Sequence, residues 1–140
     1  MNYYVFTDGA SKGNPGQASV GAVCFLNEVP DLNEFKRGYN PVFSISESIG
    51  YKTNNEAEYH SLLFALEKLF EKQIKEAQIF MDSELVVKQL NGQYKVKNEN
   101  LKTLWLRVNE LAHKGKFVFR HVPREKNSIA DYLANLAFKS

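Results

Sequence analysis

The spacing of apolar residues changes at Asn54, and this change restricts the fold more than any other feature of the sequence. Before it, three stretches are rich in β-branched and aromatic residues or alternate in polarity, as strands do: residues 3–7, 20–26 and 42–51. From Asn54 to Glu71, apolar residues recur at helical spacing. Three strands followed by a helix predict an antiparallel meander.

The second half of the chain alternates between short strands and helices. Strands are predicted at residues 77–81 and 116–122, and helices over residues 82–92, 101–112 and 128–137. The polar residues 27–40 predict a connecting loop. The order predicts an α/β fold with a five-stranded mixed sheet, in which a three-strand antiparallel meander continues into parallel strands and helices flank both faces.

Composition sets the broad class of the protein. The 140 residues, of which 44% are hydrophobic, predict one domain over residues 1–140 with one core. A net charge of +2 is compatible with a polyanionic partner but does not indicate one by itself. The one cysteine, Cys24, allows no disulfide within the chain, and no apolar run is long enough to span a membrane. Because a strand begins at once, with no room for a signal peptide, we expect a cytoplasmic protein, with a monomer as the default.

Four acidic residues lie where strands end or helices begin. Asp8 and Asp82 directly follow apolar strands, and Glu58 and Asp131 fall in the first turns of predicted helices. Taken one at a time, a structural interpretation is favoured for each: a turn dipeptide at Asp8-Gly9, a strand end and helix cap at Asp82-Ser83, and capping boxes at Asn55 with Glu58 and at Ser128 with Asp131.

Considered together, the four acids predict a metal site. Ligands in α/β folds collect where strands end and helices begin, so these positions can meet at one point. Carboxylates gathered there would repel one another and raise one another's pKa, and divalent cations would remove that repulsion. Oxygen ligands without a His–Cys cluster favour Mg²⁺ or Mn²⁺ over zinc. A carboxylate site that holds two such ions about 3.5–4 Å apart is suited to in-line displacement at phosphorus.

Four motifs carry a family resemblance that covers nearly the whole chain: TDGASKGNPG at residues 7–16, TNNEAEY at 53–59, DSELVV at 82–87 and HVPREKNSIAD at 121–131. In this order and spacing they resemble the type 1 ribonuclease H family, above all its archaeal and plant-like branch, which includes stand-alone prokaryotic members. The resemblance implies a ribonuclease H-like fold and endonucleolytic cleavage of the RNA strand of RNA/DNA hybrids, with 5′-phosphate and 3′-hydroxyl products. It also implies two Mg²⁺ ions, with Mn²⁺ as a substitute. Double-stranded RNA is a further candidate partner, and no membrane partner is expected.

The resemblance implies roles for individual residues. The metal-binding catalytic acids are Asp8, Glu58, Asp82 and Asp131. A side chain that assists turnover is matched by His121, for which a structural role at a strand end is the alternative, and by Arg124, whose guanidinium can bind phosphate but cannot act as a base. Candidate substrate contacts are Gly9, Ser11, Gly13 and Asn14, which match a loop that meets RNA 2′-hydroxyls, and Thr53, Asn54 and Asn55, for which helix capping is the alternative.

Two other functions compete with this one. A catalytically weak or silent module of the same fold would bind hybrid or RNA, but clustered carboxylates without a catalytic role would repel a polyanion. A transposase-like or integrase-like polynucleotidyl transferase shares the fold, but the short length and the segment 8–16 disfavour it. Residues 89–100 are too short for the long basic insertion of some family members, so we expect weak, salt-sensitive binding.

Overall fold

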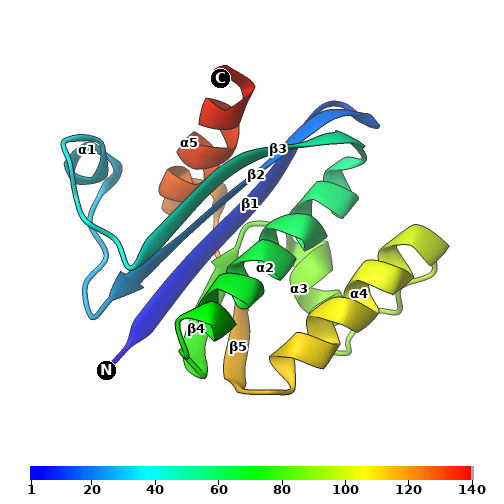
Figure 1. Cartoon of the computed structure of the whole chain (residues 1–140). Coiled ribbons are helices and arrows are strands. Elements are labelled where there is room, and N and C mark those ends of the chain that lie inside the picture. The colour runs from blue at the N-terminus through cyan, green and yellow to red at the C-terminus, as the bar shows by residue number, and fades with distance from the viewer. Residues whose placement is uncertain (140) are drawn as a thin grey trace.

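The computed structural model describes residues 1–139, which form a five-stranded sheet with helices on both faces (Figure 1). The strands are β1 (Tyr3–Gly13), β2 (Gly16–Leu26), β3 (Phe43–Lys52), β4 (Glu76–Met81) and β5 (Lys116–His121). The helices are α1 (Leu32–Lys36), α2 (Asn54–Glu71), α3 (Glu84–Leu90), α4 (Glu99–Ala112) and α5 (Ser128–Leu136), with short 3₁₀ turns η1 (Arg124–Lys126) and η2 (Ala137–Lys139).

The strands lie in the order β3-β2-β1-β4-β5. β1 pairs antiparallel with β2, and β2 pairs antiparallel with β3. β4 pairs parallel with both β1 and β5. The mixed sheet predicted from the order of elements is therefore confirmed, and β1 is the central strand at which its antiparallel and parallel halves join.

Helices cover the two faces of the sheet unequally. α2 packs on one face together with α3 and α4, and α5 packs on the other with α1 beside it (Figure 1). The larger core lies under α2 and includes the fully buried Val5, Leu66 and Ile79. A smaller core, with Phe25 and Ile129, lies under α5. Across the described residues, none of the helices combines the length and apolar character that crossing a bilayer requires.

The glycine-rich segment after Asp8 lies beyond the strand predicted at residues 3–7, yet it too is mostly strand rather than loop. β1 continues to Gly13 and β2 begins at Gly16, so the two strands form a long hairpin with a tight turn. Gly13 closes the turn with a φ of 102°, a conformation that glycine adopts without strain. Gly9 lies so close to α2 that a Cβ atom there would overlap the backbone of Ala57. These glycines therefore serve strand pairing and helix packing rather than flexibility.

Residues 27–40 connect β2 to β3 as predicted, and this connection also contains the short helix α1. α1 begins after Asp31, whose side chain accepts a hydrogen bond from the Glu34 N–H at 2.9 Å, while Glu34 Oε1 accepts one from the Asp31 N–H at 3.4 Å. This reciprocal capping stabilises a helix of only five residues. Leu32 and Phe35 then pack against the smaller core.

Neither of the two predicted capping boxes forms: α2 has its box at other residues, and α5 has no side-chain cap. At α2, Thr53 is the N-cap and Glu56 closes the box, with hydrogen bonds of 3.1 and 2.9 Å between the side chain of each residue and the backbone N–H of the other. At α5, the N-cap is Asn127, one residue before the predicted start. Neither Glu58 nor Asp131 takes part in the capping box that was predicted for it. Their carboxylates can therefore make other contacts.

Candidate active site

Three carboxylates from distant parts of the chain meet at one end of β1. Asp8 lies on β1, Glu58 on α2 and Asp82 directly after β4. One oxygen of each lies within 4.8 Å of an oxygen of the other two. Asp8 and Glu58 are only 7% and 4% exposed, whereas Asp82 is half-buried. Such buried acids are rare unless they are paired or hold a metal, so this cluster is the candidate active site.

The fold brings these acids together through strand pairing and one close helix contact. Thr7 of β1 pairs with Met81, the last residue of β4, so the residues that follow them, Asp8 and Asp82, lie side by side. The close approach of α2 to Gly9 places Glu58 against β1, and Glu58 Oε1 accepts a hydrogen bond from the Gly9 N–H. A carboxylate held by the backbone in this way has little freedom to turn out of the cluster.

The cluster is electrostatically strained without a cation. Burial, followed by the charges of Glu58, Asp82 and Asp131, raises the pKa of Asp8 to about 9. Burial likewise raises the pKa of Glu58 to about 7, although the hydrogen bond from the Gly9 N–H and, to a smaller extent, the charge of Arg124 oppose this rise. A bound divalent cation would reverse both effects because it stabilises the ionised carboxylates. The donor set consists of hard oxygens, which fit a divalent cation of this kind.

Asp131 lies near the cluster but does not belong to the group of three whose oxygens lie within 4.8 Å of one another. It is in the first turn of α5, and its charge adds to the rise in the pKa of Asp8. Its Oδ1 accepts a hydrogen bond of 3.2 Å from Asn135 Nδ2. The structure therefore brings three of the four predicted acids into direct proximity and the fourth to a longer distance.

Arg124 and His121 differ in their surroundings. Both are exposed, Arg124 at the start of η1 and His121 at the end of β5. The charge of Arg124 acts on Glu58, where it opposes the rise in pKa that burial causes. His121 lies instead near Glu84 in the first turn of α3, whose pKa is lowered mainly by Lys88 and to a smaller extent by His121.

The predicted substrate contacts lie around the start of α2 and the hairpin turn. Asn14 Oδ1 accepts a hydrogen bond of 3.0 Å from the Asn54 N–H, which ties the turn to the helix. A cavity of about 260 Å³ is lined by Asn14, Thr53 and Asn55, among others. In the same hairpin, Ser11 Oγ donates to the Gly13 carbonyl at 2.5 Å. Gly9, by contrast, is buried against α2.

Asn127 is a residue of this site that sequence reasoning missed. It is 1% exposed, and its Nδ2 donates to the Thr7 carbonyl at 2.9 Å and to Asp82 Oδ2 at 3.3 Å. The only available signal was an Asn four positions before Asp131, within a motif whose cap was assigned to Ser128.

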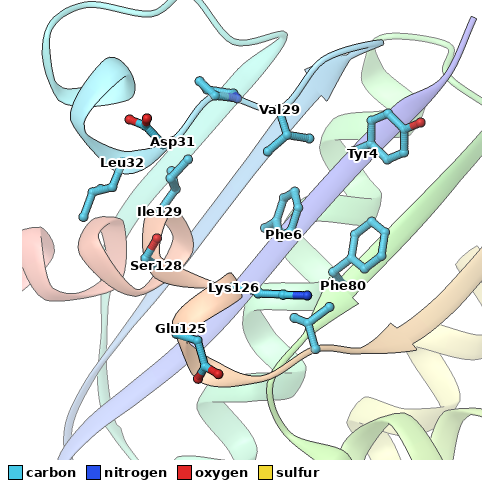
Figure 2. Close-up of a pocket in the computed structure, with 12 residues that line it drawn as sticks. Tyr4, Phe6, Val29, Asp31, Leu32, Phe80, Glu125, Lys126, Ser128 and Ile129 are labelled. Atoms are coloured by element: carbon cyan, nitrogen blue, oxygen red, sulfur yellow. The ribbon is translucent and has the colours of Figure 1, made fainter.

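An aromatic groove lies apart from the acids on the α5 face of the sheet (Figure 2). Its volume is about 500 Å³, and Tyr4, Phe6 and Phe80 from β1 and β4 contribute to its wall. The rings of Phe6 and Phe80 stack with centroids 5.0 Å apart. In the part of the chain that the structure describes, none of the four acids lines this groove, so it is not the candidate active site.

Comparison with known proteins gives consistent matches over nearly the whole chain. A family model described as "Reverse transcriptase-like" matches residues 6–137. The chain is 36% identical over 137 residues to a bifunctional protein of Mycobacterium tuberculosis, covering 96% of this chain and 35% of that protein. It is 36% identical over 135 residues to Ribonuclease HI of Halobacterium salinarum, covering 96% of this chain and 63% of that protein. The chain thus spans about a third of the first relative and under two thirds of the second.

A solved structure also matches the whole fold. LC11-RNase H1, whose structure was determined in complex with an RNA/DNA hybrid, superposes with a TM-score of 0.85 at 38% sequence identity. The match covers 99% of this chain and 97% of that one. This similarity shows that the two chains share the same overall fold.

Proposed function

The chain belongs to the type 1 ribonuclease H family, and on that premise we propose that it is an endonuclease that hydrolyses the RNA strand of RNA/DNA hybrids. The products would carry 5′-phosphate and 3′-hydroxyl ends. The observation that supports this proposal best is the meeting of Asp8, Glu58 and Asp82 within 4.8 Å at the end of β1. The hybrid bound to the similar LC11-RNase H1 supports the choice of substrate.

The resident cation of this site is proposed to be Mg²⁺, with two ions per site and Mn²⁺ as a substitute. Asp8, Glu58 and Asp82 would hold it, with Asp131 contributing from the longer distance of α5. When bound, Mg²⁺ supplies Lewis-acid stabilisation of phosphoryl oxygens and lowers the pKa of coordinated water. The part played by the chain would be to bring these carboxylates together before a cation arrives.

Arg124 is proposed to contact a phosphate of the substrate. It is exposed and its charge reaches Glu58, so a guanidinium here can face the substrate backbone beside the acids. Guanidinium binds phosphate in a bidentate manner and stays protonated at neutral pH, which suits orientation and charge stabilisation rather than proton abstraction. His121 remains the alternative for assistance to turnover.

Recognition of RNA is proposed to occur at the β1–β2 hairpin and the start of α2. The contacts would come from Ser11, Gly13, Asn14, Thr53, Asn54 and Asn55, whereas Gly9 is buried behind them and serves to hold Glu58. The 3.0 Å hydrogen bond between Asn14 and the Asn54 backbone fixes the hairpin against α2, so both segments present one continuous surface. Contacts to the 2′-hydroxyl distinguish RNA from DNA, and polar side chains and backbone groups of this kind can make them.

The test is incubation of the chain with an end-labelled RNA/DNA hybrid, with and without Mg²⁺, beside double-stranded RNA and RNA alone. We expect Mg²⁺-dependent cuts in the RNA strand of the hybrid, and a loss of at least about 100-fold in Asp8→Asn. Asp31→Asn, which changes an exposed acid on the N-cap of α1, is the matched control and should cut like the wild type. Hybrid binding without cleavage would instead favour a silent binding module.

A further inference from the structure

Asn127 does not do what an asparagine at the start of a helix usually does. An N-cap asparagine normally accepts a hydrogen bond from an N–H of the first turn through its side chain. At α5, Asn127 holds the N-cap position, but its side chain makes no such bond. The amide is directed instead into the candidate active site, where it is 1% exposed.

The contacts of Asn127 reach the surroundings of three of the four acids. Its Nδ2 donates to the carbonyl of Thr7, the residue before Asp8, at 2.9 Å, and to Asp82 Oδ2 at 3.3 Å. Its backbone carbonyl accepts the N–H of Asp131 at 3.1 Å. Asn127 therefore links the end of β1, the end of β4 and the first turn of α5.

The orientation of the amide follows from these partners. Turning it over would place Oδ1 against the Thr7 carbonyl and the Asp82 carboxylate, two acceptors that would repel it. Among the described residues, Oδ1 has no hydrogen-bond partner, although it is buried. A buried acceptor without a partner lowers the stability of the folded chain by about 1–3 kcal/mol. Stability alone therefore does not explain an asparagine at this position.

From this geometry we propose that Asn127 is a positioning residue, which holds Asp82 in the orientation that the metal site needs. The inference rests on the proposed function of the site. Asp82 is the half-buried member of the group of three, and one of its carboxylate oxygens lies within 4.8 Å of oxygens of Asp8 and Glu58. Repulsion would turn such a side chain towards solvent.

A neutral amide is well suited to oppose that movement. It donates a hydrogen bond to one oxygen of Asp82 and connects that oxygen to the β1 backbone. A lysine or arginine could do the same, but its positive charge would compete with the cation. Groups that hold a ligand in place behind a metal site typically change metal affinity or activity by about 10–100-fold when they are removed.

The experiment compares Asn127→Ala with Ser19→Ala, a matched control. Ser19 Oγ is buried and donates to the Ala134 carbonyl at 2.6 Å, so it also ties the sheet to α5 but contacts no acid. Each variant is titrated with Mg²⁺ while the backbone amide signal of Gly9, the partner of Glu58, is followed by ¹⁵N NMR. Urea unfolding without metal is measured alongside.

Both variants should lose stability, but only Asn127→Ala should bind Mg²⁺ more weakly, by about 10-fold. Its hybrid cleavage at low Mg²⁺ should fall by a similar factor and recover largely as Mg²⁺ is raised, which a loss of stability alone would not produce. An Mg²⁺ affinity equal to that of the wild type overturns the proposal. So does a wild-type chain that binds no Mg²⁺.

Failure of the proposed function gives a different result, in which the wild type binds Mg²⁺ but leaves the hybrid uncut. The affinity comparison then still decides the role of Asn127. If Asn127→Ala does not fold, Asn127→Ser replaces it, because serine is a good N-cap but is too short to bridge to Asp82. If neither folds, the side-chain amide signal of Asn127 in the wild type decides: it should shift with the midpoint of the Mg²⁺ titration, and an unchanged signal overturns the proposal.

Discussion

Replacing Asp8 by asparagine tests the electrostatics of the site without any substrate. The variant keeps the shape of the side chain but removes the charge that burial and the neighbouring carboxylates penalise. The pKa of Asp8 is about 9 in the folded chain, whereas the ordinary pKa of an aspartate, which applies to the unfolded chain, is 3.8. Folded Asp8 thus holds its proton more tightly, and ionisation favours the unfolded state as the pH rises above 3.8. The wild type should therefore lose stability relative to the variant between about pH 4 and pH 9.

The size of the effect follows from the same two values. Within this window the difference grows by about 1.4 kcal/mol per pH unit, which gives about 4 kcal/mol between pH 3.8 and pH 7. Asparagine donates a weaker hydrogen bond to Glu58 than a protonated carboxyl group does, which lowers the expected gain to about 2–3 kcal/mol at pH 7. Near pH 4 the electrostatic gain is absent, so the weaker hydrogen bond should leave the variant about 1–2 kcal/mol less stable than the wild type.

The assay is urea unfolding followed by circular dichroism, from pH 4 to pH 8 with EDTA present. Asp31→Asn is the control, because Asp31 is exposed and asparagine preserves the N-cap of α1, so its effect should stay within about 0.5 kcal/mol at every pH. Added Mg²⁺ should narrow the gap, since it stabilises the wild type more than the variant. A variant no more stable than the wild type at pH 7, or a gap independent of pH, would refute the reasoning.

Three further predictions follow from the site and its surroundings. Since the site retains a proton on Asp8 at pH 7, Mg²⁺ affinity measured by NMR titration should rise by up to about tenfold per pH unit towards pH 9, and a flat profile would contradict this. Arg124→Ala should lower kcat at saturating hybrid more than His121→Ala does, and the reverse order would assign the assisting role to the histidine. Tyr59→Phe should cost about 1–3 kcal/mol in urea unfolding with unchanged Mg²⁺ affinity, because buried Gln89 loses the 2.7 Å hydrogen bond from the Tyr59 hydroxyl; a neutral change would show that Gln89 finds another partner.

Elements whose pattern extends over several turns or strand residues could be predicted from the sequence. α2 runs from Asn54 to Glu71 as its apolar spacing indicated, and the order of strands and helices predicted the mixed sheet. The hairpin after Asp8 could not be predicted, because glycines that serve close packing look the same in a sequence as glycines that serve a flexible loop. Gly9 is in a strand because α2 lies against it, and that contact joins residues far apart in the chain.

The site shows where local reasoning about acids at helix starts fails and how it can be improved. A capping box needs one acid, and at α2 the geometry of the first turn assigns that role to Glu56, not Glu58. An acid beyond what the cap requires, in a first turn that faces a strand end, is then the better candidate for a ligand. Looking for acids that a helix cap does not require would not have found Asn127. Its main hydrogen-bond partner is the Thr7 carbonyl, 120 positions earlier in the chain. Residues that bind a hard cation can be predicted from the sequence, because few side chains carry suitable oxygen ligands. A group that only orients them can be any donor at the right place, so it becomes visible only when the fold shows what it touches.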